Sequence, residues 1–317
     1  MIYLELAAGF IYLLMGGDLL VRGAVALARR LRVPPVVVAA TVVGFGTSLP
    51  ELVVSVHATL LGYPDLILGN VVGSNIANVL LVGGASAMVY PIAHDDPAVR
   101  RNAGLMIAAV GGFAVLAYVG DLSRAVGIGL LVAFGVMMVA TIRSTVAEMK
   151  GGDTSTPLDW LLGIPSRLGT IALFIVAGVV MLPLGAQLLV DSAITVAQRF
   201  DVPENVIGLT VLAIGTSLPE LTTTVLAAME KRSDVAIGAI VGSNTFNVLA
   251  IMGVSATLSS TPIPVSARFL TMDVPVMLVT SGVLTLFAWR VRPIGRAGGI
   301  VMLLAYVAYL GTLYLVI

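Results

Sequence analysis

One block of polar residues occurs twice in this chain, each time inside a long apolar stretch. Gly-Thr-Ser-Leu-Pro-Glu runs over 46–51 and again over 215–220, and Gly-Ser-Asn follows at 73–75 and at 242–244. Glu51 and Glu220 are 169 residues apart, and so are Asn78 and Asn247, which close the two blocks. Buried carboxylates, hydroxyls and amides are costly unless something satisfies them. We therefore expect the two blocks to face each other across a metal ion.

The rest of the sequence is typical of a membrane protein. Of the 317 residues, 58% are hydrophobic and 11% are charged, and the formal net charge is zero, so nothing indicates a nucleic-acid partner. Apolar segments of about 18 residues or more, long enough to cross a bilayer, recur from end to end. We predict an all-α polytopic membrane protein with ten transmembrane helices, at roughly 2–27, 35–61, 66–90, 102–119, 125–142, 168–197, 204–229, 235–257, 269–289 and 297–316.

The repetition divides the chain into two five-helix repeats. The first covers 1–146 with its motif stretch at 44–78, the second covers 168–317 with its motif stretch at 213–247, and a linker at 147–167 joins them. Because five is odd, the second repeat must enter the membrane upside down relative to the first. Two inverted repeats that meet near the bilayer midplane are the architecture of secondary transporters.

Basic residues predict the orientation in the membrane. The predicted loops on one side, including 143–167, hold 13 Lys and Arg residues, whereas the loops on the other side hold only Arg124, Arg199 and Arg268. Cytoplasmic loops carry the excess of Lys and Arg. We therefore expect the 143–167 loop to be cytoplasmic and both termini to lie outside.

The chemistry of the two blocks suits a hard cation. Residues four apart share a helix face, as Thr47 and Glu51 do, and glycine and proline interrupt the helix there. Broken backbone at membrane depth is tolerated where its carbonyls line a polar cavity or bind an ion. All the donors are oxygens, which suit Ca²⁺ or Na⁺ better than zinc or copper. Small polar residues often serve only helix packing, but packing does not require two carboxylates.

The doubled motifs resemble the alpha repeats of the sodium/calcium exchanger family, within the cation/calcium antiporter superfamily. The resemblance covers about 16–84 and 185–253. It implies a prokaryotic-type antiporter of the plasma (inner) membrane that carries Ca²⁺ and Na⁺ as substrates and needs no cofactor. By the same resemblance, Glu51 and Glu220 bind Ca²⁺, and Asn78 and Asn247 form the central pair. The further ligands that it implies are Thr47, Ser48, Ser74, Thr216, Ser217, Ser243 and the carbonyls near Gly44 and Ala213.

Two departures from relatives bear on the coupling ion. Some relatives, including potassium-dependent ones, carry Asp where this chain has Asn247, so we do not expect potassium co-transport. Proton-coupled members typically read Gly-Asn-Ala-x-Glu at the first motif, which favours sodium here. Proton-coupled cation antiport is the alternative, followed by a channel or a structural membrane protein with a bound cation. No nucleophile–base pair or cofactor motif indicates an enzyme, and no obligate protein partner is evident.

Two charged positions outside the blocks have simpler interpretations. Asp18 and Arg22 are four residues apart, which predicts an ion pair on one helix face. Asp273 is a lone acid in the ninth predicted helix, and we expect it to lie near the membrane edge in contact with solvent.

Overall fold

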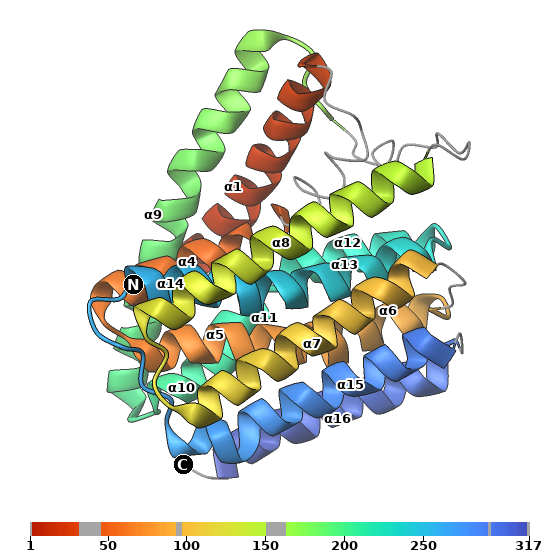
Figure 1. The fold of residues 1–317 in the computed structure, drawn as a ribbon. Coiled ribbons are helices and arrows are strands. Elements are labelled where there is room, and N and C mark those ends of the chain that lie inside the picture. Colours follow the sequence, from red (N-terminus) through yellow and green to blue (C-terminus); the bar gives the residue numbers. More distant parts are fainter. Residues whose placement is uncertain (1, 32–45, 93–96, 150–162, 291–292, 316–317) are drawn as a thin grey trace.

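The structure is a computed structural model that describes residues 2–31, 46–92, 97–149, 163–290 and 293–315 (Figure 1). Apart from isolated β-bridges, every secondary-structure element in these ranges is a helix. The elements labelled η are π-helices. The first half contains α1 (Ile2–Arg30), α4 (Leu49–Leu61), α5 (Pro64–Ala77), η2 (Asn78–Gly83), α6 (Gly84–Val89), α7 (Pro97–Val119) and α8 (Arg124–Met149). The second half contains α9 (Leu168–Phe200), α10 (Glu204–Ile207), η3 (Gly208–Leu212), α11 (Ala213–Thr216), α12 (Leu218–Met229), α13 (Ser233–Phe246), η4 (Asn247–Ile251), α14 (Met252–Leu258), η5 (Phe269–Asp273), α15 (Val274–Arg290) and α16 (Arg296–Leu315).

The described helices follow the predicted spans in order. Eight are long and apolar enough to cross a membrane, and the pair Glu204–Thr216 and Leu218–Met229, bent by 44°, makes a ninth candidate. The predicted span at 35–61 is described only from Gly46 onward, where α4 forms an apolar helix of 13 residues. A mostly helical polytopic membrane fold is therefore confirmed, while ten helices in two inverted repeats stay a prediction.

Glycines bring α1 and α9 together. An added Cβ on Gly9 would lie 3.0 Å from the carbonyl oxygen of Gly185, and one on Gly178 would lie 2.7 Å from that of Gly16. These contacts are equivalent, because Gly178 and Gly185 are Gly9 and Gly16 advanced by 169 residues. Small residues allow such close approach of two helices. The two helices pack along each other, and their upper parts extend away from the bundle (Figure 1).

The helices that carry the Gly-Ser-Asn motifs form the centre of the bundle. In the most apolar stretches of Pro64–Val89 and Ser233–Leu258, 94% and 78% of the residues are buried, against at most 44% in the other six long helices. At the centre, an added Cβ on Gly69 would lie only 2.8 Å from the Cα of Gly208. The two Gly-Ser-Asn motifs therefore lie in the most deeply buried of the long helices that the structure describes.

The outer helices repeat the same packing in both halves. An added Cβ on Gly84 in α6 would lie 3.1 Å from the carbonyl oxygen of Gly299 in α16, and one on Gly253 in α14 would lie 3.2 Å from that of Gly127 in α8. Since Gly253 is Gly84 advanced by 169 residues, α16 covers α6 much as α8 covers α14. The last helix of each half therefore packs against the central helix of the other half.

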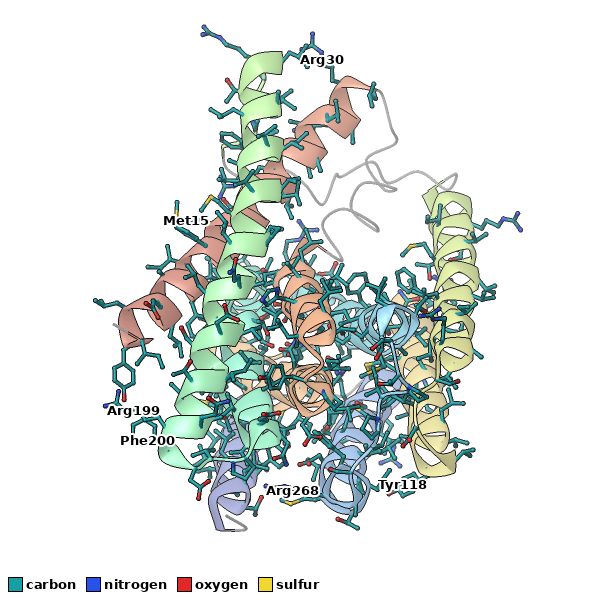
Figure 2. The ribbon with its side chains drawn as sticks, turned by 90° about the vertical axis from the view of Figure 1, so that its left-hand side faces the viewer. Met15, Arg30, Tyr118, Arg199, Phe200 and Arg268 are labelled. Atoms are coloured by element: carbon teal, nitrogen blue, oxygen red, sulfur yellow. The ribbon has the colours of Figure 1, made fainter. Side chains whose placement is uncertain are left out.

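The N- and C-termini lie on the same side of the bundle in Figure 1. Figure 2 views the molecule from that side, with Arg30 at the top, at the end of α1, and Arg268 near the bottom. The assignment of one side of the bundle to the cytoplasm stays a prediction.

One expectation about the charged residues is wrong and one is confirmed. Asp273 is 0% exposed, and its Oδ1 accepts a hydrogen bond of 2.9 Å from the hydroxyl of Tyr309 in α16. It ends the π-helical segment η5, which faces it into the protein instead of toward solvent. The pair of Asp18 and Arg22 forms as predicted, with 2.8 Å between Oδ1 and Nε.

Candidate cation-binding site

Helix breaks bring both Gly-Thr-Ser-Leu-Pro-Glu motifs into the interior. Ser48 and Ser217 precede α4 and α12 with similar backbone angles, φ −91° and ψ 11° against φ −83° and ψ 5°, and both lie in the bridge region between helix and strand. Pro50 and Pro219 follow two residues later and have no N–H to donate to the carbonyl four residues earlier. Each motif therefore interrupts its helix and leaves one carbonyl without its helical donor.

The breaks place Glu51 and Glu220 in the first turns of α4 and α12, where they are 0% and 1% exposed. The free N–H groups and the positive end of the helix dipole favour negative charge there. Each carboxylate also accepts a hydrogen bond from the other half of the chain. Ser48 Oγ lies 2.7 Å from Glu220 Oε1, and Ser217 Oγ lies 3.5 Å from Glu51 Oε1. The second oxygen, Oε2, of each carboxylate is buried and has no partner among the described residues.

The serines of the Gly-Ser-Asn motifs occupy unlike environments. Ser243 Oγ donates to Glu220 Oε1 at 3.2 Å, and the Thr47 side chain lies near this carboxylate. Ser74, the counterpart of Ser243, is 0% exposed, and its hydroxyl has no partner within the described ranges. Glu220 therefore accepts hydrogen bonds from more hydroxyl groups than Glu51 does, although the two motifs have the same sequence.

Asn70 joins the two halves at a position that the repeat did not indicate. Its Nδ2 donates to the Glu51 carbonyl at 3.2 Å and to Ser55 Oγ at 2.9 Å, and its Oδ1 accepts from Thr216 Oγ1 at 3.2 Å. It is 0% exposed. The repeat does not indicate this residue, because position 239, its counterpart, is alanine. A polar residue in an otherwise apolar turn of α5 was the signal that could have found it.

The central amides begin the two matched π-helical segments, since Asn78 opens η2 and Asn247 opens η4. Such segments interrupt α-helices frequently at functional sites. Asn78 Nδ2 donates to Asn244 Oδ1 at 3.1 Å, and Asn244 Nδ2 donates to the Asn75 carbonyl at 3.3 Å. Asn75 and Asn244 belong to the quoted motifs but were not predicted as site residues.

Of the two expected carbonyl ligands, Ala213 alone lies in the part of the chain that the structure describes, and Gly44 lies outside it. Ala213 begins α11 and is 0% exposed. Its carbonyl accepts a hydrogen bond of 3.2 Å from the backbone N–H of Ser217. A carbonyl oxygen has two lone pairs, so this bond leaves one for a cation.

The arrangement can hold a divalent cation. Glu51 and Glu220 lie close enough to repel each other electrostatically, and two ionised carboxylates balance the charge of one Ca²⁺. Neutral hydroxyl, amide and carbonyl oxygens around them complete the kind of ligand set that hard cations prefer. The same oxygens can coordinate Na⁺, whose lower charge needs only one carboxylate for balance.

Comparison with known proteins gives a consistent picture. The family model described as "Sodium/calcium exchanger protein" matches residues 2–143 and 170–315, one match for each half of the chain. The inner membrane protein YrbG of Escherichia coli is 34% identical over 313 residues, which cover 98% of this chain and 95% of YrbG. The sodium/calcium exchanger MaX1 of Methanosarcina acetivorans is 30% identical, with 98% of each chain covered.

Among solved structures, the chain is similar to the sodium-calcium exchanger NCX_Mj soaked with Na⁺ and Sr²⁺. The TM-score is 0.68 at 30% identity, and the alignment covers 98% of this chain and 99% of that one. The similarity therefore extends over nearly the whole length of both chains.

Proposed function

Because the chain belongs to the sodium/calcium exchanger family, we propose that it exchanges Na⁺ for Ca²⁺ across a membrane by alternating access. In this proposal the repeats at 1–146 and 168–317, joined by the linker at 147–167, are inverted relative to each other and share one site near the bilayer midplane. The strongest support is the reciprocal contact between the halves, in which Ser48 binds Glu220 and Ser217 contacts Glu51.

The proposal gives each predicted residue a role. Glu51 and Glu220 bind Ca²⁺ through their Oε2 atoms, which have no partner within the described residues, because two negative charges neutralise a divalent ion inside the membrane. The neutral oxygens help to bind Na⁺ or Ca²⁺, and they come from Thr47, Ser48, Ser74, Asn78, Ala213, Thr216, Ser217, Ser243, Asn247 and, by the resemblance, Gly44.

The unequal halves support alternating access. Ser243 and Asn78 have hydrogen-bond partners, whereas Ser74 and Asn247 have none among the described residues. A transporter with inverted repeats opens to one side when its repeats adopt two different conformations, and it opens to the other side when they exchange them. A symmetric sequence with asymmetric hydrogen bonds is what such a mechanism requires.

Sodium is the proposed coupling ion, and proton coupling is the second candidate. The hydroxyl pairs Thr47–Ser48 and Thr216–Ser217 are neutral ligands that suit Na⁺ and that carry no titratable proton near neutral pH. MaX1 is named a sodium/calcium exchanger, which supports the same choice. The two buried carboxylates could also carry protons, and this keeps the second candidate in the test below.

The proposed location is the plasma (inner) membrane, with both termini outside and the 143–167 loop in the cytoplasm. The name of the Escherichia coli relative, an inner membrane protein, supports this location. The excess of basic residues on one side supports the orientation. We propose Na⁺ and Ca²⁺ as the ligands and the lipid bilayer as the surroundings, with no cofactor and no obligate protein partner.

The test is uptake of ⁴⁵Ca²⁺ into proteoliposomes that contain the purified protein. Uptake should require an outward Na⁺ gradient and should respond little to a pH gradient alone. Glu51→Gln and Glu220→Gln should abolish it, whereas Glu5→Gln, a matched change on α1 away from the site, should not. Uptake driven by a pH gradient and indifferent to Na⁺ would move the protein to the proton-coupled class, and no uptake under either gradient would contradict calcium antiport.

A further inference from the structure

A bound cation cannot satisfy every polar atom of the central amides, Asn78 and Asn247. Asn247 is 0% exposed, and neither its Oδ1 nor its Nδ2 has a partner among the residues described. A cation can satisfy Oδ1, but Nδ2 is a donor and cannot ligate one. A buried donor without an acceptor is costly, so Nδ2 must find an acceptor in some state of the protein.

The repeat identifies that acceptor. Asn78 Nδ2 donates to Asn244 Oδ1, and advancing Asn78 by 169 residues gives Asn247, while Asn244 is Asn75 advanced by the same number. The counterpart of the observed bond therefore runs from Asn247 Nδ2 to Asn75 Oδ1. Both of these atoms are buried, and neither has a partner in the described structure. One of two equivalent bonds is formed, and both ends of the other are unpaired.

We propose that Asn75 and Asn244 are positioning residues for the central amides and act in turn. Asn244 holds Asn78 in the access state seen here, and Asn75 holds Asn247 in the opposite state. When its Nδ2 is held, the amide turns its Oδ1 toward the cation, and Asn78 Oδ1 is buried with no partner in the part of the chain that the structure describes. The inference rests on the proposed function, because it needs a bound cation and two access states.

The second bond requires little rearrangement of its acceptor. Asn75 Nδ2 already donates to the Val71 carbonyl at 2.8 Å within its own helix, which fixes the side chain. Its Oδ1 can accept Asn247 Nδ2 without losing that bond. The second bond then needs an approach of η4 to α5 that matches the approach of η2 to α13, where Asn78 already bonds Asn244.

The test measures Ca²⁺ half-saturation separately from each face of the membrane, in proteoliposomes. The chain has no cysteine, so one cysteine introduced in an exposed loop allows the molecules of one orientation to be blocked. Asn244→Ala should raise half-saturation about tenfold on one face, since tenfold corresponds to about 1.4 kcal/mol, the size of one net hydrogen bond. It should change the other face less than about twofold, and Asn75→Ala should show the reverse.

Two further variants separate positioning from a general structural role. Asn102→Ala, on α7 and outside the site, should leave both faces unchanged. Asn75→Asp and Asn244→Asp keep the accepting oxygen but lose the amide donors to the Val71 and Asn75 carbonyls, so each should weaken Ca²⁺ binding on its own face less than the matching alanine variant does. Equal shifts on both faces for the alanine variants, no shift on either face, or Asp variants as weak as the alanine variants would each overturn the inference.

Equilibrium binding of Ca²⁺ and Na⁺ to the purified protein, read as cation-dependent thermal stabilisation, keeps the two proposals distinguishable. Both alanine variants should weaken binding, and Asn102→Ala should not. If the wild-type protein binds the cations without exchanging them, the proposed function fails and the binding result alone decides the inference. If the wild-type protein binds neither cation, the inference fails as well.

Discussion

Replacing Glu220 with Gln should lower the affinity of the site for Ca²⁺ much more than its affinity for Na⁺. The substitution keeps the size of the side chain and removes one of two negative charges. Glu220 Oε1 accepts the hydroxyls of Ser48 and Ser243, and an amide oxygen can accept both. Because Oε2 has no partner among the described residues, an NH₂ group in its place breaks no existing bond. The fold should survive, and the effect should be electrostatic.

The magnitude follows from the charge of the ion. At about 2.4 Å and an effective dielectric constant of about 20, one carboxylate attracts Ca²⁺ by about 14 kcal/mol and Na⁺ by about 7 kcal/mol before desolvation is subtracted. If desolvation offsets nine tenths of each value, about 1.4 and about 0.7 kcal/mol remain, which correspond to tenfold and threefold losses of affinity. The factor for Ca²⁺ should thus be about the square of the factor for Na⁺.

The assay is binding of ⁴⁵Ca²⁺ to purified Glu220→Gln protein and its displacement by Na⁺, with thermal unfolding as a check of the fold. Glu5→Gln, a matched change at an exposed position on α1, serves as the control and should bind both cations normally. Equal losses for Ca²⁺ and Na⁺, or wild-type affinity for both, would refute the claim that this carboxylate is a direct ligand.

Four other changes test hydrogen bonds and helix packing through thermal unfolding of the cation-free protein. Ser48→Ala removes a 2.7 Å hydrogen bond to a carboxylate and should cost about 1.5–3 kcal/mol, whereas Ser217→Ala, whose bond is 3.5 Å long, should cost less than about 1 kcal/mol. Gly69→Ala puts a Cβ 2.8 Å from the neighbouring backbone and should cost about 1–3 kcal/mol through overpacking. Tyr309→Phe leaves the buried Asp273 without its donor and should cost about 1–3 kcal/mol, with little change in cation affinity because α16 carries no proposed ligand.

For each of these changes, one outcome would contradict the expected result. Gly112→Ala, at a glycine with nothing within 4 Å of an added Cβ, should be neutral, and a loss equal to that of Gly69→Ala would mean that the close helix contact is not the cause. Equal losses for the two serine variants would contradict the geometric difference between them. An unchanged unfolding temperature for Tyr309→Phe would show that Asp273 is satisfied in another way.

The sequence could predict which polar residues are buried in the interior because its signal was doubled. Two identical motifs with a carboxylate at the same position in an apolar chain indicated that Glu51 and Glu220 would be buried, and both are. The constant offset also relates contacts that the structure shows, such as those of Gly9 with Gly185 and of Gly178 with Gly16. Most of the helices could be predicted for the simpler reason that a membrane requires long apolar segments.

The sequence could not predict how the two halves differ. Identical motifs carry no information on which serine is bonded, and that depends on the conformation of each repeat. Asn70 was missed because Ala239 breaks the repeat there. Asp273 was misplaced because its partner, Tyr309, lies 36 residues away in a helix with no polar motif. The π-helical turns at Asn78 and Asn247 have no propensity signal, since they arise from packing at the centre of the bundle.

An experimental structure of the protein soaked with Ca²⁺, or with Sr²⁺ as a heavier analogue that anomalous scattering can locate, tests the shared site without any assumption about transport. One ion should lie between Glu51 and Glu220, within about 2.3–2.6 Å of a carboxylate oxygen of each for Ca²⁺. An ion bound to only one of the two carboxylates, or bound elsewhere with the space between them empty, would contradict a single site built by both halves of the chain.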